Sequence, residues 1–179
     1  MTEIKRRGLI IIHTGEGKGK TTAAMGIALR AAGHKFKILM MQFIKGTWHY
    51  GELDAVKQLY PNFEIVPLGK GFITLGDKMP DPKDIQIVEQ GWNYCKERII
   101  SGKYDIIILD EINYVIYYKL LPLEKVLNVL KKKPESLHLI LTGRSAHPKI
   151  IEIADLVTEM KEIKHPFNKG VKAQKGIEF

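Results

Sequence analysis

The sequence is poor in cysteine and has no long apolar run. Its single cysteine, Cys95, excludes an internal disulfide and any metal site built from several cysteines. Cys95 belongs to a helical pattern of apolar residues, so we expect a buried core thiol rather than a reactive one. The apolar run near the N-terminus, residues 9–12, is too short for a secretory segment or a membrane span. We therefore expect a cytoplasmic protein without a membrane partner.

The sequence also lacks the spacings that are typical of metal centres. None of the six histidines stands at a convincing ligand spacing, so a zinc or iron site is not expected. His147, which directly precedes Pro148, is interpreted as a turn residue. Internal repeats, low-complexity tracts and long linkers are missing too. We therefore expect a single domain over residues 1–179, which the motifs described below identify as a nucleotide-binding α/β domain.

Acidic residues are fewer than basic ones, with 20 Asp and Glu against 28 Lys and Arg, and the formal net charge is +8. This excess favours anionic partners, for which nucleic acid and a polyphosphate ligand are both candidates. The lysines are scattered, with a denser stretch at Lys161–Lys175. An arginine-rich tract and the aromatic–basic interleaving of single-strand binders are both missing. A solvated surface explains the charge at least as well as a nucleic-acid footprint, and we do not expect nucleic-acid binding.

What the sequence does contain is a regular alternation of short apolar runs and helical patterns. Several of the runs are continuous in Ile, Leu and Val, as in parallel strands that are covered on both faces. The predicted strands are Gly8–His13, Lys37–Phe43, Phe63–Pro67, Asp105–Asp110, Leu137–Thr142 and Leu156–Ile163. The predicted helices are Lys20–Ala32, stopped by Gly33, then Gly51–Leu59, Lys83–Ile100 and Pro122–Lys132. The alternation predicts an α/β fold, with an open, mostly parallel sheet flanked by helices.

Ligands bind such sheets beyond the carboxyl ends of the strands. The first loop there, HTGEGKGKTT at residues 13–22, is a phosphate-binding loop with one residue missing. The usual pattern, G-x-x-x-x-G-K-[ST], would place its first glycine at position 14, which is Thr14, and the nearest glycine is Gly15.

This loop nevertheless follows a strand and opens a helix, which is the context that phosphate binding requires. Its glycines let backbone N–H groups converge on phosphate oxygens, Lys20 neutralises phosphate charge, and Thr21 or Thr22 could hold Mg²⁺. The expected phosphate-binding residues are Thr14, Gly15, Glu16, Gly17, Lys18, Gly19, Lys20, Thr21 and Thr22.

Two further loops carry polar residues after apolar strands. YDIIILDEINY ends its run at Asp110 and Glu111, a Walker-B-like pair whose carboxylates meet Mg²⁺ directly or through water. The alternative is that two acidic residues simply end a buried strand. In LTGRSAHP, Arg144 could bind phosphates with two hydrogen bonds, or it could bind loop carbonyls as a structural residue. These residues predict a protein that binds Mg-nucleotide and leave the reaction open.

These segments, with several others, closely resemble the ATP:corrinoid adenosyltransferase family of the phosphate-loop type, the cob(I)alamin adenosyltransferases. The matching stretches run in order from Gly8 to Phe179: GLIIIHTGEGKGKTTAAMGIALRAAGH, QFIKG, GEL, GKGF, ILDEINY, LTGR and IADLVTEMKEIKHPFNKGVKAQKGIEF. The resemblance implies a P-loop NTPase (RecA-like) architecture. It also implies that the shortened loop is the family's normal form, and that the loop holds ATP in the opposite orientation to that in ordinary phosphate-loop enzymes.

By the same resemblance, the Co(I) of a corrinoid, cobalamin or cobinamide, attacks the ribose C5′ of ATP, a Co–C bond forms and triphosphate leaves. Co(I) has no proton to lose, so no general base is needed. The resemblance implies that Lys20, Thr21 and Glu111 are catalytic. It also implies that Mg²⁺, with Mn²⁺ as the alternative, is held by Thr21, Asp110 and Glu111. Arg144 and Arg30 are expected near the nucleotide.

On the corrin side, the resemblance assigns Phe72 to the lower face of the ring. Thr74 stands where the family commonly has tryptophan, so the shielding of that face rests on Phe72 and unidentified neighbours. The family also implies a reduced flavin or flavoprotein as electron source, and a homodimer. Two other functions stay open from the residues alone: an ordinary ATPase or kinase that uses Glu111, and a nucleotide-dependent nucleic-acid binder.

Overall fold

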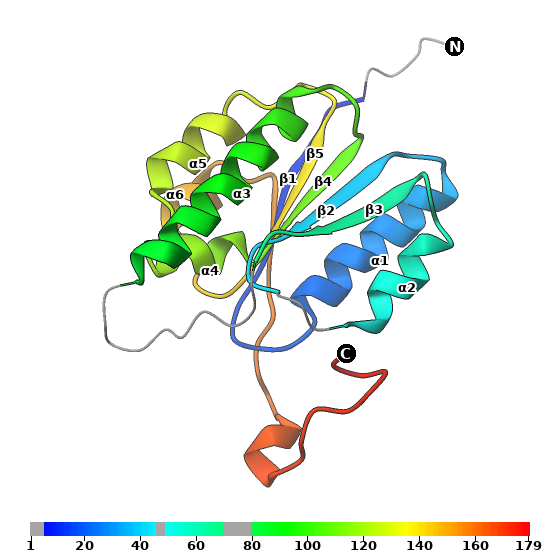
Figure 1. Cartoon of the computed structure of the whole chain (residues 1–179), viewed down its shortest axis with the longest axis vertical. Helices are drawn as coiled ribbons and strands as arrows, with labels where there is room; N and C mark the ends of the chain where they lie inside the picture. The colour runs from blue at the N-terminus through cyan, green and yellow to red at the C-terminus, as the bar shows by residue number, and fades with distance from the viewer. Residues whose placement is uncertain (1–5, 46–48, 70–79) are drawn as a thin grey trace.

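The computed structural model describes residues 6–45, 49–69 and 80–179, which form one parallel sheet with helices on both faces (Figure 1). The strands are β1 Ile10–Thr14, β2 Ile38–Gln42, β3 Phe63–Pro67, β4 Ile106–Asp110, β5 His138–Thr142 and β6 Leu156–Glu159. They lie in the order β3-β2-β4-β5-β1-β6, and every neighbouring pair is parallel. The predicted α/β fold is confirmed.

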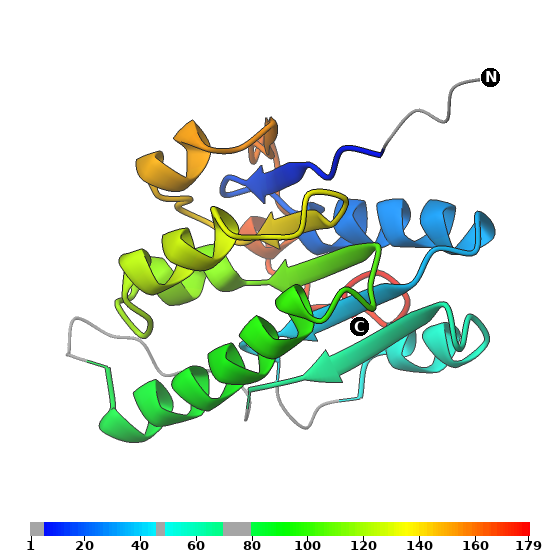
Figure 2. The ribbon, with the colours of Figure 1, turned by 90° about the horizontal axis from the view of Figure 1, so that it is seen from above.

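The helices form two layers, which Figure 2 shows on opposite sides of the sheet. They are α1 Lys20–Gly33, α2 Gly51–Lys57, α3 Pro82–Ile100, α4 Ile112–Tyr117, α5 Leu123–Leu130 and α6 Pro148–Glu152, followed by the 3-10 helix η1 Pro166–Lys169. Successive strand residues point to opposite faces. In β2, Leu39 and Met41 therefore pack with α3 to α6, whereas Ile38 and Met40 pack with α1 and α2.

The layer formed by α3 to α6 holds the larger apolar core. Trp92 is 2% exposed and Cys95 is fully buried, so both are core residues, as the sequence predicts for Cys95. Burial raises the pKa of the Cys95 thiol far above its usual range, and the unreactive thiol that the sequence predicts is confirmed. None of the helices in the described ranges is long and apolar enough to cross a membrane.

Most predicted elements are present, with errors at their ends. The bounds of β3 are those predicted, and β2, β4 and β5 differ by a residue at one or both ends. Strand β1 begins two residues later and ends one residue later than predicted. Helix α1 includes Gly33 rather than stopping before it, and α2 and α5 end two residues earlier than predicted. Pro122 precedes the first turn of α5 instead of beginning it.

The largest error concerns β6, which ends at Glu159 and not at Ile163. The chain leaves the sheet because Met160 turns towards the loop after β1. Its N–H donates to the Thr14 carbonyl over 2.8 Å, and its own carbonyl accepts from the Gly17 N–H over 2.7 Å. The helices α4 and α6 and the 3-10 helix η1 were not predicted, since they are too short to show a helical period.

The parallel arrangement places the carboxyl ends of all strands at one edge of the sheet. The loops after β1, β2, β4 and β5 therefore meet there, as the sequence predicts. His147 has an extended backbone and caps α6 by accepting from the Lys149 N–H over 3.2 Å, so it is an N-cap residue rather than part of a turn.

Candidate functional site

The loop between β1 and α1 is shaped by the chain that crosses it after β6. Gly15 and Gly19 have φ angles of 96° and 106°, which favour glycine. A Cβ on Gly15 would lie 2.5 Å from the Met160 carbonyl oxygen, and one on Gly17 would lie 2.8 Å from the same atom. The glycines are therefore required as much by this close approach as by the loop conformation. The crossing segment fills the side of the loop that faces β6.

Lys20 begins α1 and points back into the loop. Its Nζ donates to the carbonyls of Gly15 and Gly17 over 2.8 and 2.7 Å, and the residue is 8% exposed. Burial lowers the pKa of Lys20, and the nearby Glu111 carboxylate opposes that shift. The positive N-terminal end of α1 lies at the same place, so cationic charge and backbone N–H groups converge on a volume suited to an anion.

Asp110, at the end of β4, is the fixed centre of the site. It is fully buried, and one of its oxygens accepts from the hydroxyls of Thr21 and Thr142 over 2.9 and 2.7 Å. Its other oxygen accepts from the Gln42 side chain over 3.3 Å. Three elements thus hold the carboxylate, namely α1, β5 and β2, and they link it directly to the phosphate loop.

Glu111 follows with a left-handed backbone, φ 64°, stabilised by a hydrogen bond from its N–H to the Thr142 hydroxyl over 2.9 Å. Burial, with a smaller contribution from Asp110, raises the pKa of Glu111 to about 7, although Lys20 and Arg144 act against the shift. The neighbouring Gly143 has a φ of 121°, which favours glycine, and a Cβ there would lie 3.0 Å from the Tyr114 backbone nitrogen. Glu111 therefore occupies a costly position beside the loop.

These groups match the ligand chemistry of Mg²⁺. Thr21, Asp110 and Glu111 offer hydroxyl and carboxylate oxygens, and the hydrogen bond between Thr21 and Asp110 brings two of them together. No cluster of three or more His, Cys, Asp or Glu suited to a metal occurs among the residues that the structure describes. Mg²⁺ usually binds one or two carboxylates together with substrate phosphates and water, and Asp110 and Glu111 supply that number of carboxylates.

The remaining predicted site residues differ in their distance from the loop. Arg144, after β5, pairs with Glu16 of the phosphate loop over 2.8 Å, so its guanidinium lies at the loop. Arg30 is exposed ten residues along α1 from Lys20, which corresponds to roughly 15 Å of helix, and it does not join the group. Phe72 and Thr74 lie outside the described residues.

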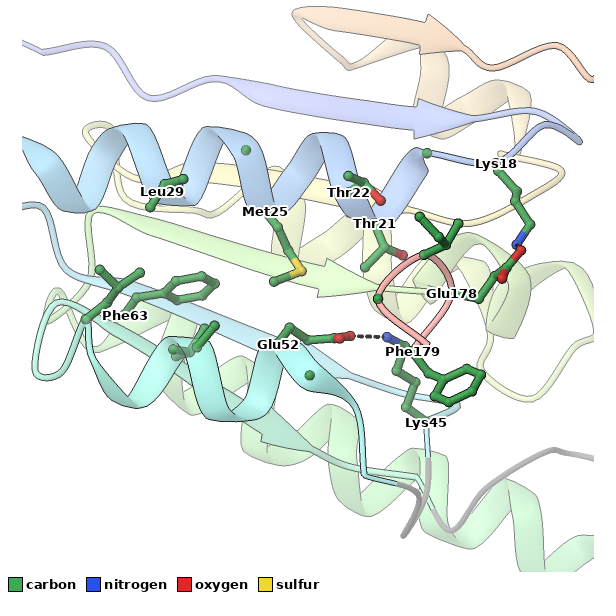
Figure 3. A pocket seen from close by; sticks show the side chains of 18 residues that line it. Lys18, Thr21, Thr22, Met25, Leu29, Lys45, Glu52, Phe63, Glu178 and Phe179 are labelled. Carbon is green, nitrogen blue, oxygen red and sulfur yellow. Dashed lines mark hydrogen bonds and ion pairs between the residues drawn. The ribbon is translucent and has the colours of Figure 1, made fainter. Parts of the chain in front are cut away.

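A cavity of about 750 Å³ adjoins the loop between α1 and α2 (Figure 3). It is bounded by Thr21, Thr22 and Met25 of α1, and by Gly176–Phe179 at the C-terminus. Its deeper part is apolar, with Phe63 among the lining residues. A ligand larger than phosphate could therefore occupy the loop and the adjoining cavity together.

Sequence reasoning missed three charged residues that line this cavity, Lys45, Glu52 and Glu178. Lys45, after β2, pairs with Glu52 of α2 over 2.6 Å and lies 4.2 Å from the centre of the Tyr50 ring. It also missed Gln42 and Thr142, which hold Asp110. Four of these residues, Gln42, Lys45, Glu52 and Thr142, lie in the stretches QFIKG, GEL and LTGR. The spacing of the residues within these stretches does not indicate a role in binding or catalysis.

The comparisons with known proteins agree with this site. Residues 6–179 match the family model described as ATP:corrinoid adenosyltransferase BtuR/CobO/CobP. The corrinoid adenosyltransferase of Escherichia coli K12 is 40% identical over 173 residues, which are 97% of this chain and 86% of that protein. The Sinorhizobium enzyme of the same name is 39% identical, over 99% of this chain and 83% of its own. Corrinoid adenosyltransferase CobA of Salmonella typhimurium is 38% identical, over 98% and 87%.

Among solved structures, the flagellar accessory protein FlaH from Methanocaldococcus jannaschii superimposes with a TM-score of 0.59. It is 14% identical, and the match covers 86% of this chain and 71% of that one. At this identity the likeness shows the fold alone, which is a parallel sheet flanked by helices.

The raised pKa of Glu111 predicts a cost in stability. Between its unfolded value near 4.5 and its folded value of about 7, the folded protein binds more protons than the unfolded chain, so the free energy of unfolding falls as pH rises. Glu111→Gln removes this dependence. At pH 8, without divalent cations, we expect the variant to be more stable by an amount on the order of 3 kcal/mol at most.

Thermal melts at pH 8 and pH 5 measure this difference. The two proteins should differ clearly in Tm at pH 8 and little at pH 5, where Glu111 is protonated in the folded protein. Equal melting temperatures at both values would contradict the buried, costly position of this carboxylate.

Proposed function

The chain belongs to the ATP:corrinoid adenosyltransferase family, and on this basis we propose that it transfers the 5′-deoxyadenosyl group of ATP to the Co(I) of a corrinoid. The product contains a new Co–C bond, and inorganic triphosphate is released. The observation that carries the proposal is a family match over residues 6–179 that includes the shortened loop, folded here around Lys20. Cobalamin and cobinamide are the corrinoids we consider.

We propose that ATP binds with its triphosphate in the loop and its ribose turned away from β6. Two features support this orientation. The Met160 carbonyl already accepts from the Gly17 N–H on the β6 side, so a ligand there would have to displace protein. On the opposite side, the cavity beside Thr21 and Thr22 is open to receive the rest of the nucleotide. Such a pose leaves C5′ accessible to a corrinoid.

The main demand of this reaction is on the leaving group. As the C5′–O bond breaks, negative charge grows on the triphosphate, and groups that are already in place stabilise it without reorganising. Lys20 is suited to this role because it must only exchange the carbonyls of Gly15 and Gly17 for phosphate oxygens. The N-terminal end of α1 and Arg144 act in the same direction. Thr21, Asp110 and Glu111 would hold Mg²⁺ (or Mn²⁺), which supplies further positive charge to the triphosphate when it is bound.

Co(I) attacks as an electron pair without a proton, so no residue has to act as a general base. A glutamate at the position of Glu111 could orient water in an ordinary ATPase, and this is the competing function.

Phe72 is proposed to contact the corrin ring. The electron source is proposed to be a reduced flavin or flavoprotein. Measuring the rate of cobalt reduction with a reduced flavin and with a reduced flavoprotein would test the proposed electron source.

ATP and a chemically pre-reduced corrinoid should give a light-sensitive Co–C product and one equivalent of triphosphate. Visible spectra before and after illumination detect the product, and anion chromatography identifies the phosphate species. Chelating divalent cations should stop the reaction. ADP and orthophosphate without cobalt alkylation would instead establish the ATPase alternative.

Lys20→Ala should lower kcat by about 100-fold or more, because loss of a single charge-stabilising donor typically costs this much. The matched control is Lys131→Ala, a substitution of an exposed lysine directly after α5. Steady-state kinetics with Co(I) corrinoid compare the two after circular dichroism has shown that both variants are folded. Near-normal turnover by Lys20→Ala would remove this residue from the catalytic group.

We propose a homodimer that uses β6. This edge strand leaves Leu156 and Val157 exposed by 47% and 38%, although they point to opposite faces of the sheet. Leu156→Lys should shift a dimer towards monomer in sedimentation velocity experiments. Ile100→Lys is the control, since Ile100 is 66% exposed at the end of α3. A wild-type monomer at micromolar concentration would contradict the proposal.

A further inference from the structure

The C-terminal residues Gln174–Phe179, which we call the C-terminal strap, fold back onto the phosphate loop. The strap is a compact turn, in which the N–H groups of Ile177 and Glu178 donate to the Gln174 carbonyl over 3.1 and 2.9 Å. Its last four residues form part of the wall of the cavity between α1 and α2 (Figure 3). The strap therefore covers part of the space that adjoins the loop.

An ion pair joins the strap to the loop. Lys18 lies between Gly17 and Gly19, and its Nζ contacts Glu178 Oε1 at 2.8 Å. Glu178 Oε2 accepts from the Gln174 N–H, which fixes the carboxylate within the turn. The Glu178 side chain is 15% exposed, whereas that of Lys18 is 51% exposed. The lysine is thus the free-moving partner, and it is the partner that belongs to the phosphate loop.

We propose that polyphosphate bound in the loop takes Lys18 away from Glu178 and thereby releases the C-terminal strap from the cavity. The inference rests on the proposed function only in requiring that polyphosphate binds in this loop. A triphosphate carries several negative charges, whereas Glu178 carries one, so it competes strongly for the same ammonium group. The carboxylate that Lys18 leaves behind then faces a polyanion at close range, and their repulsion favours departure of the strap.

The consequence is a coupling between the loop and the cavity wall. With the loop empty, Lys18 keeps the strap in place beside Thr21 and Lys45, both of which line the cavity. With the loop filled, the wall formed by the strap opens, and it closes again when triphosphate leaves. Access to the cavity through this wall therefore depends on whether the phosphate loop is occupied.

A spin label on the strap tests the release. Lys175→Cys places a thiol at an exposed strap position, and the only other cysteine, Cys95, is fully buried, so labelling is selective. Magnesium tripolyphosphate is the probe, and calorimetry establishes its binding and saturation. The immobile component of the spectrum should convert to a mobile one on saturation. Binding without this conversion overturns strap release alone, whereas failure to bind overturns the phosphate site on which both proposals rest.

Glu178→Gln provides the second test and leaves the phosphate loop intact. In the labelled protein this variant should be mobile without ligand. It should also bind tripolyphosphate about two- to fivefold more tightly, since an exposed ion pair of typical strength no longer competes. Lys172→Gln is the control; it changes the charge of an exposed residue just before the strap and should alter neither measurement. Weaker binding by Glu178→Gln would show that Glu178 helps to hold the ligand, and it would overturn the proposal.

Discussion

The hydrogen bond from the Gly17 N–H to the Met160 carbonyl is the constraint on which the arrangement of the site depends. It pulls the chain out of the sheet after β6, requires glycine at positions 15 and 17, and sends the C-terminal segment across the phosphate loop. A loop one residue shorter than the usual pattern therefore has protein on one side and the cavity on the other. The proposed direction of the bound nucleotide rests on this asymmetry, because the described residues leave space on the cavity side and fill the side that faces β6.

Charge around the loop is arranged as a set of exchangeable pairs. Lys18 pairs with Glu178, Arg144 with Glu16 and Lys45 with Glu52, while Lys20 donates to loop carbonyls. Each cation thus has a partner in the ligand-free protein, and an incoming polyphosphate replaces those partners without having to create the cationic site. The pairs also differ in burial. Lys20 is nearly buried and stays directed at the loop, whereas Lys18 and Arg144 are half-exposed and can change partners at little cost.

The sequence was most informative where the structure is determined locally. The continuous apolar runs and the Gly-Lys-Thr segment predicted the parallel sheet, the position of the loop and the acidic end of β4. The early end of β6 could not be predicted, because Leu156–Ile163 reads as a strand and only the contacts of Met160 with a loop about 145 residues away end it. Lys45, Glu52 and Glu178 were missed for the same reason, since each gains its role from a partner that the fold supplies. Arg30 lies about ten residues along α1 from Lys20, and its place near the nucleotide stays a prediction.

Asp110, at the end of β4, and Glu111, directly after it, lie in different surroundings. The fully buried Asp110 carboxylate accepts three hydrogen bonds, from the side chains of Thr21, Gln42 and Thr142. Glu111 is largely buried without comparable donors to its carboxylate, and its left-handed backbone holds it beside Asp110, so its charged form is disfavoured. The free energy that this position costs the empty protein is recovered when positive charge arrives. A cation that bound beside Glu111 would therefore stabilise the folded protein by more than one bound to a well-solvated carboxylate.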